Sequence, residues 1–202
     1  MVNYNGASRP LIRGIFSLAL VLYALVGFGQ DSSIPLPIQV PIPLPIQVPI
    51  PPSIRVPESS RLIWHAYAKG VQVYVCTQDP KDTANFIWTF KEPRANLYAD
   101  SSYHQLVGRH YFDAGKNPTW ETADGSKVSG IKVQQANSPD SAAIPWLLLH
   151  VTTTSGNATL TQAIFIQRIR TKGGKAPAKG DRPNKGQSIE VAYTAEYLFY
   201  KI

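Results

Sequence analysis

The sequence predicts one all-β domain, an antiparallel sandwich or barrel, behind a signal peptide and a proline-rich linker. From about residue 54 onward, short runs rich in β-branched and aromatic residues recur. Turn-forming pairs such as Lys69-Gly70, Asp79-Pro80 and Glu92-Pro93 separate them. Many short strands with this punctuation are typical of sandwiches and barrels. The 202 residues leave room for one domain of ordinary size.

Residues 1–30 have the features of an export signal. Arg9 and Arg13 precede an apolar run from Gly14 to Gly29, and small residues lie just before Gln30. The run of about 16 residues is shorter than the ~20 that span a bilayer, which favours cleavage over an uncleaved anchor. We therefore expect an exported protein that is periplasmic, in the cell envelope or extracellular. Membrane contact is expected only through an uncleaved signal.

Residues 31–53 form the predicted linker, which consists mostly of an octapeptide repeat. IPLPIQVP occurs at 34–41 and again at 42–49, and 50–57 reads IPPSIRVP. Proline fixes φ, removes a backbone donor and moves the preceding residue out of the helical region, so polyproline II remains. Twenty-four such residues reach roughly 75 Å, as a semi-rigid spacer would. A proline-motif ligand, and packing against a partner or another copy, stay open.

The domain is predicted to span residues 54–202. Its last strand is the clearest, because five residues alternate on one face: Val191, Tyr193, Ala195, Tyr197 and Phe199. Thr194 and Glu196 lie on the other face, as in a sheet with one wet side. Earlier strands are expected in RLIWHAYA, VQVYVC, NFIWTF, KVSGIKVQQ, WLLLHVTT and TQAIFIQRI. Helix is expected only as one turn beginning within Asp82 to Trp88.

The order of the sequence landmarks resembles a known family. They run AKGVQVYVC, FIWTFKEPRANLYAD, VGRHY, PTWETADGSKVSG, IPWLLL, IQRIRTKGGKAP and VAYTAEYLFY. This order is similar to that of the exported bacterial and fungal family catalogued as domain of unknown function 3455. The resemblance covers residues 54–202 and implies little about function.

Cys76 is the only cysteine of the chain, and its place in VQVYVC predicts burial rather than intermolecular pairing. The family resemblance implies a second cysteine shortly after the GGKAP element, paired with the one at the YVC position. In this chain Asp181 stands at about that place. The implied disulfide is therefore missing, and Cys76 is left without it.

The densest polar stretch runs from 100 to 127. It contains His104, His110, Asp113, Trp120, Glu121, Asp124 and Lys127. A structural interpretation makes ADGSK a hairpin turn, places Trp120 in the core and pairs Glu121 with Lys127 or Arg109 across strands. A second interpretation is a ligand pocket formed by His110, Trp120 and Glu121 together with Lys127. A third is a catalytic site of a secreted hydrolase-like enzyme, in which His110 acts with Glu121 or Asp124.

The sequence predicts neither a metal site nor a cofactor. His104 and His110 would lie ~20 Å apart on a continuous strand, and the compact ligand spacings H-E-x-x-H and C-x-x-C are absent. The nucleophile motif G-x-S-x-G and the phosphate-binding loop pattern are also missing.

Positive charge is concentrated near the C-terminus. The chain carries +7, which falls to +5 without the two arginines of residues 1–30. The basic residues of this segment are Arg168, Arg170, Lys172, Lys175, Lys179, Arg182 and Lys185. They predict either a solvated loop or contact with an envelope polyanion or acidic glycan. Nucleic acid is not expected, because no aromatic residue lies between Phe165 and Tyr193 to stack on bases.

Taken together, these features predict an exported, non-catalytic binding module. An uncharacterised secreted enzyme with a His and carboxylate site within 104–127 is the alternative. The sequence leaves the ligand, the oligomeric state and the use of the Asn157 glycosylation sequon open.

Overall fold

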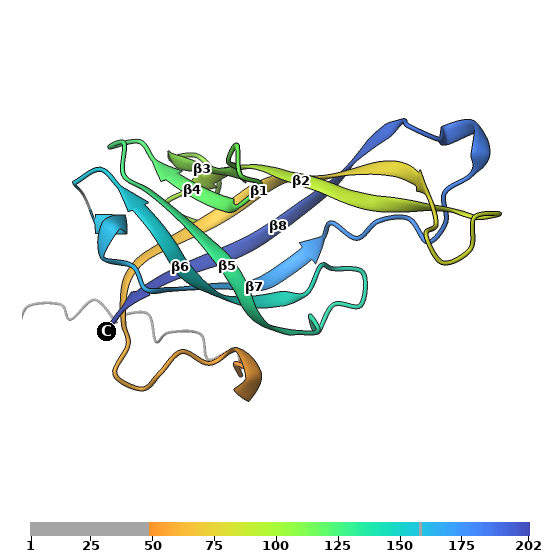
Figure 1. Ribbon diagram of the computed structural model, residues 1–202. Coiled ribbons are helices and arrows are strands. Elements are labelled where there is room, and N and C mark those ends of the chain that lie inside the picture. The colour runs from red at the N-terminus through yellow and green to blue at the C-terminus, as the bar shows by residue number, and fades with distance from the viewer. Residues whose placement is uncertain (1–48, 158) are drawn as a thin grey trace, which may run out of the picture. The chain divides into compact units, whose positions relative to one another are not determined.

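Eight antiparallel strands form a closed barrel in which each strand pairs with the next along the chain. The computed structural model describes residues 49–157 and 159–202. The predicted signal peptide and most of the predicted linker lie outside these residues. The strands are β1 (Arg61–Gln78), β2 (Phe86–Tyr98), β3 (Leu106–Phe112), β4 (Pro118–Thr122), β5 (Lys127–Ala136), β6 (Trp146–Ser155), β7 (Phe165–Gly173) and β8 (Ser188–Lys201) (Figure 1). Three short 3₁₀ helices accompany them: η1 (Pro52–Ile54), η2 (Thr159–Gln162) and η3 (Arg182–Asn184). The all-β prediction is confirmed, and the architecture is a barrel.

The alternation predicted for the last strand produces the inner face of β8. Tyr193, Ala195, Tyr197 and Phe199 are all nearly inaccessible to solvent, while the residues between them are partly exposed. Pairing of β8 with β1 closes the barrel, for example at Ala68 opposite Ala195. Small side chains at this junction leave room for the large rings of β8 inside the barrel.

The helical turn expected within Asp82 to Trp88 is not formed. Asp82 begins a tight turn, in which its side chain accepts hydrogen bonds from the amide of Ala84 and from the side chain of Asn85. The backbone amide of Asn85 donates to the Asp82 carbonyl at 2.9 Å, and β2 begins at the next residue. Aspartate side chains that bond the backbone two residues on favour such turns over helix.

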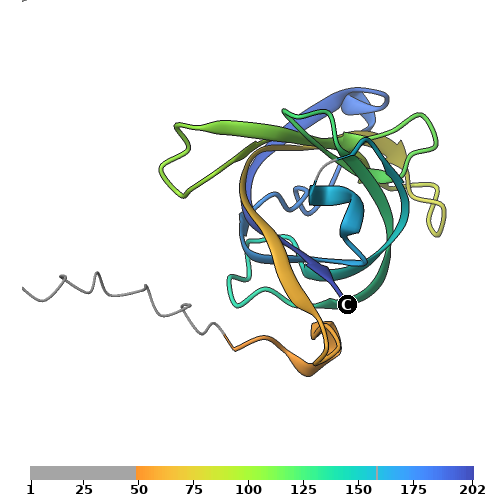
Figure 2. The same ribbon diagram turned by 90° about the vertical axis from the view of Figure 1, so that its left-hand side faces the viewer.

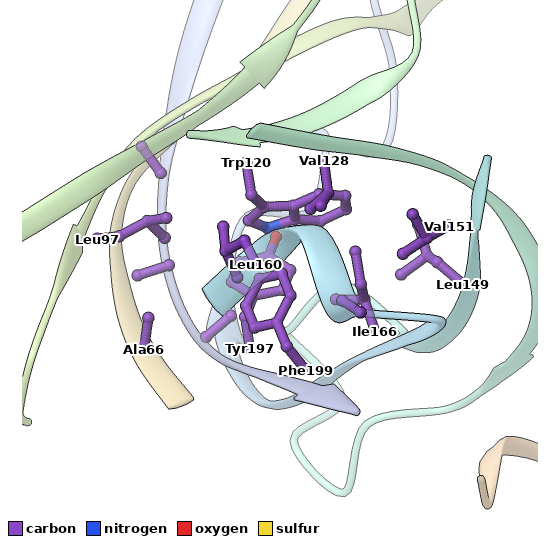
Figure 3. Packing of buried hydrophobic residues seen from close by; sticks show 14 of the residues in the cluster. Ala66, Leu97, Trp120, Val128, Leu149, Val151, Leu160, Ile166, Tyr197 and Phe199 are labelled. Carbon is purple, nitrogen blue, oxygen red and sulfur yellow. The ribbon is translucent and has the colours of Figure 1, made fainter. Parts of the chain in front are cut away.

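One end of the barrel is plugged by η2. In Figure 2 the strands form a ring, and η2 lies inside it. Leu160 of η2 is 1% exposed and packs among Trp120, Phe199 and Ile166 (Figure 3). This cluster contains large apolar side chains from several strands, so burial of apolar surface is the main stabilising contribution at this end.

The third copy of the octapeptide packs on the outside of the barrel. Ile54 of η1 is fully buried against Trp146, Leu148 and Ile169. The Gln167 side-chain amide donates to the Ile54 carbonyl at 2.6 Å. Ile50 and Val56, at the other apolar positions of this copy, pack against the same cluster. These contacts attach the end of the predicted linker to the outer face of β6 and β7.

The wall of the barrel is incomplete at the end opposite η2. β3 and β4 stop at a hairpin whose last pair is Phe112 opposite Pro118. β2 and β5 continue past this hairpin, and Figure 1 shows the greater length of β2. Among the described residues, 87–94 of β2 pair only with β1, and 130–136 of β5 pair only with β6. The interior is therefore open between β2 and β5.

Candidate functional site

A cavity of about 500 Å³ lies inside the open end of the barrel. Ligand pockets in proteins commonly have volumes of 300–1,000 Å³. Apolar side chains form much of its wall, including Phe90, Phe112, Leu147 and Leu149. Its mouth lies beside the β3–β4 hairpin, where Ile131 of β5 is half exposed. The shortness of β3 and β4 thus places a solvent-accessible opening in an otherwise continuous wall.

Three aromatic rings form the inner part of the cavity. His110 of β3 and Trp120 of β4 are direct cross-strand partners, and their rings stack at 4.4 Å with 12° between the planes. Tyr197 of β8 contacts both, with ring centroids 5.1 Å from His110 and 5.3 Å from Trp120. All three side chains are nearly inaccessible to solvent. They separate the open cavity from the apolar cluster around η2.

His110 is a neutral imidazole of fixed tautomer. Its Nδ1 atom donates to the Thr119 carbonyl at 2.9 Å, because a carbonyl oxygen can only accept. Burial lowers the pKa of His110 to about 3, although the bond to Thr119 acts in the opposite direction. The charge of Arg168 lowers this pKa further. His110 therefore presents an unprotonated Nε2 near neutral pH, and its low pKa makes it a weak general base.

Arg168 of β7 supplies a positive charge to the cavity. It lies two residues after the buried Ile166 and directly opposite Tyr197 across the β7–β8 ladder, so strand alternation directs it inward. Its Nε and Nη2 atoms donate to the Pro145 carbonyl at 3.2 and 2.9 Å. Within the described ranges, Arg168 has no carboxylate partner, and its other hydrogen-bonding neighbour is the Tyr197 hydroxyl.

Several buried polar atoms around the cavity also lack partners. In the part of the chain that the structure describes, Gln72 Nε2, Trp120 Nε1 and the hydroxyls of Tyr193 and Tyr197 make no hydrogen bond of normal geometry. Tyr197 and Gln72 lie close enough to Tyr193 to affect its pKa, which burial raises well above its ordinary value. Buried polar atoms usually have partners, because desolvating an unpaired one costs roughly 1–3 kcal/mol. Tyr197 and Gln72 are hydrogen-bonding neighbours of Tyr193, so these groups form a buried polar cluster inside the barrel.

The predicted site residues divide between the two faces of the barrel wall. His110 and Trp120 point inward and line the cavity. Glu121 points outward and pairs with Arg109 at 2.9 Å and Lys127 at 3.7 Å, the cross-strand pairing that the structural interpretation expected. Tyr111 also donates to Glu121, and this bond is the main cause of its lowered pKa. A strand places neighbouring residues on opposite faces, so His110 and Glu121 cannot face one another.

The other polar residues of 100–127 lie in loops. Asp124 and Gly125 form the predicted hairpin turn, with φ of +83° at Gly125. His104 is exposed in the β2–β3 loop. Asp113 accepts a hydrogen bond from the Asn117 amide at 2.9 Å and so shapes the hairpin beside the cavity mouth. The convergence of His110 with Glu121 or Asp124 that a hydrolase would need is not formed.

The basic segment does not form one surface. Arg168 lines the cavity, and Arg170 pairs with Glu196 on the outside of the barrel at 3.0 Å. Lys175, Lys179, Arg182 and Lys185 lie in the β7–β8 loop. Contact of this loop with a polyanion or glycan stays a prediction.

Cys76 is buried and free, and it lies next to the chain position where the family resemblance implies a second cysteine. Its Sγ atom is 3.4 Å from the Asp181 carbonyl oxygen. A Cβ atom at Gly180 would come within 2.8 Å of the same sulfur. The two segments that the implied disulfide would join are therefore in contact without it.

Across residues 49–157 and 159–202, no group of three or more His, Cys, Asp or Glu side chains could hold a metal ion. No helix in the described part of the chain has the length and apolar character needed to cross a membrane.

Sequence reasoning missed Gln72, Arg168 and Tyr197 as cavity residues. Arg168 was assigned to the basic segment because of its neighbours in the sequence. The signal that could have placed it inside is the alternation of Ile166 and Arg168 in the predicted strand TQAIFIQRI.

Comparison with known proteins identifies the family to which the chain belongs. The sequence pattern of the family described as "Protein of unknown function (DUF3455)" matches residues 57–201, a span that contains all eight strands. The resemblance drawn from the sequence landmarks is thereby confirmed. No curated protein and no solved structure matches the chain.

Proposed function

This chain belongs to the DUF3455 family, and we propose that its barrel is an exported, non-catalytic binding module that holds a small organic molecule in the open-end cavity. The single observation that carries the proposal is a cavity of about 500 Å³ whose wall combines apolar side chains with Arg168, a cation that has no carboxylate partner among the described residues. An eight-stranded barrel is wide enough either to be filled by side chains or to hold one small ligand. The aromatic rings and η2 fill one end of this barrel and leave the other end for a ligand.

Binding is better supported than catalysis because the chemistry of the cavity is that of a receptor. His110 is a weak base, and the carboxylate of Glu121 lies on the other face of the wall. No aspartate or glutamate is among the residues that line the cavity. The wall therefore offers apolar contacts and hydrogen bonds, without an acid and base pair to transfer a proton.

The neutral fluorescent probe N-phenyl-1-naphthylamine tests the proposal by titration. We expect saturable binding of one probe molecule to the unaltered chain. Ile131→Trp should weaken binding at least about tenfold, because Ile131 lines the cavity mouth and a larger side chain would obstruct it.

Val133→Trp is the matched control. Val133 lies two residues further along β5 and is exposed to a similar extent, but it does not line the cavity. This variant should bind the probe within about twofold of the unaltered chain. Absence of saturable binding, or equal binding by the two variants, would contradict the proposal.

A further inference from the structure

The charged side chains that line the cavity are all positive. Three cationic side chains line it, Arg168 in the interior and Lys116 and Lys132 at the mouth, and no acidic residue does. Lys132 donates to the Gln135 side chain, and Arg168 donates to the Pro145 carbonyl and lies within hydrogen-bonding reach of the Tyr197 hydroxyl. Among the described residues, none of the three cations forms an ion pair with a carboxylate. A partly buried arginine normally has an anionic partner, because an unpaired charge is costly to remove from water.

The unpartnered polar atoms near Arg168 are chiefly hydrogen-bond donors. Trp120 Nε1 and Gln72 Nε2 can only donate, and the Tyr197 hydroxyl can donate as well. Tyr197 stands directly opposite Arg168 across the β7–β8 ladder, and both the charge of Arg168 and a side-chain hydrogen bond from it act on the pKa of Tyr197, which burial raises. An anionic oxygen that reached Arg168 would form a charge-assisted hydrogen bond with it. Charge-assisted hydrogen bonds of this kind are about twice as strong as neutral ones.

The rest of the wall excludes a ligand that is charged throughout. Phe90, Phe112, Leu147 and Leu149 contribute apolar surface to the cavity wall. Such a surface favours an alkyl or aryl body, because each apolar group transferred from water onto it is stabilised. The charge belongs at one end of the ligand and the apolar body at the other.

We propose that the cavity binds a small monocarboxylate with an apolar body, and that Arg168 holds its carboxylate. This inference rests on the proposed function and specifies its ligand class. The guanidinium is suited to the role because its planar N–H groups match the two oxygens of a carboxylate. The bonds from Nε and Nη2 to Pro145 use two of its five N–H groups and hold the side chain in place, so N–H groups on both Nη1 and Nη2 remain for a carboxylate.

The test compares octanoate with octanol as competitors of N-phenyl-1-naphthylamine at neutral pH. The two compounds share an apolar chain and differ in the charged group. We expect octanoate to displace the probe at a concentration at least about tenfold lower than octanol does, since only octanoate forms a charge-assisted bond. Arg168→Met should remove this preference, whereas Arg168→Lys should keep part of it.

Two controls separate the possible failures. Arg109→Met removes an arginine from the outer face of the barrel and should leave the preference for octanoate unchanged. Probe binding by each Arg168 variant reports whether the cavity is still formed. Absence of probe binding in the unaltered chain would overturn the proposed function itself. Probe binding with equal displacement by acid and alcohol would overturn the carboxylate inference alone, and so would a preference that survives in Arg168→Met.

Discussion

The two ends of the barrel interior are formed by the same strands but differ in chemistry. Along β7, Ile166 packs at the η2 end, and Arg168 lines the cavity. Along β8, Phe199 packs near η2, and Tyr197, two residues earlier, lines the cavity and lies within hydrogen-bonding reach of Arg168. A shift of two residues on one strand face therefore changes the interior from apolar to polar. The comparison indicates that the closed end contributes most of the stability and that the open end retains buried polar groups at a cost in stability.

The largest expected effect is at the closed end. Leu160→Ala should lower the free energy of unfolding by about 3 kcal/mol, because it removes a buried side chain and leaves a cavity under η2. Chemical denaturation measures the change. Leu106→Ala, at a half-exposed leucine, is the control and should change stability by no more than ~0.5 kcal/mol. If folded Leu160→Ala also lost probe binding, the two ends would not be independent.

A second prediction uses the pKa of His110 at the boundary between the ends. Its pKa is about 3 in the folded chain and 6.5 in the unfolded chain, so the unfolded chain takes up a proton first as the pH falls. The stability that depends on neutral His110 is fully present above pH 6.5 and decreases toward pH 3. By pH 5 the free energy of unfolding is lower by about 2 kcal/mol. Denaturation midpoints determined between pH 7.5 and 5 measure this loss of stability.

The matched variants for this prediction are His110→Gln and His104→Gln. His110→Gln should remove most of the pH dependence in this window, whatever its absolute stability. His104→Gln alters an exposed loop histidine and should retain it. An unchanged pH dependence in His110→Gln would mean that another group causes the loss.

The smallest predicted effect comes from two opposite substitutions, of which one removes a buried hydroxyl and the other adds one. Tyr197→Phe removes an unpartnered buried hydroxyl and should raise stability by up to about 1 kcal/mol. Phe199→Tyr adds a hydroxyl to the apolar end and should lower stability by at least about 1 kcal/mol. Thermal unfolding of both variants gives the comparison. Changes of the same sign would show that the two ends do not differ in the way described here.

Local features of the fold could be predicted from the sequence, because they depend on neighbouring residues. The alternation in β8, the Asp124-Gly125 turn and the pairing of Glu121 with Arg109 and Lys127 all follow from strand periodicity and turn chemistry. Closure into a barrel depends on the register between β1 and β8, which are more than a hundred residues apart. The local pattern is compatible with both a sandwich and a barrel, so it could not decide between them.

The candidate site was predictable only in part for the same reason. His110 and Trp120 were identified from a polar stretch of sequence, and both line the cavity. Glu121 and Lys127 belong to the same stretch but lie on the outer face. Arg168 enters the site from a strand that is distant in sequence, and the opening exists because β3 and β4 are shorter than their neighbours. Strand alternation could show that Arg168 points inward, but neither the strands that it faces nor the relative lengths of β2 to β5 are visible in any short window of the chain.

The incomplete wall has a consequence for how molecules of this protein avoid aggregation. A fully closed barrel has no strand edges, but here β2 and β5 each expose backbone groups and apolar side chains, notably Phe90 and Val133. Edges of this kind can pair with another molecule in the manner of amyloid. Pro93 interrupts the donors along the β2 edge, and charged neighbours such as Lys91 and Lys132 disfavour close approach of a second edge. The opening between β2 and β5 thus requires residues that protect the molecule from self-association.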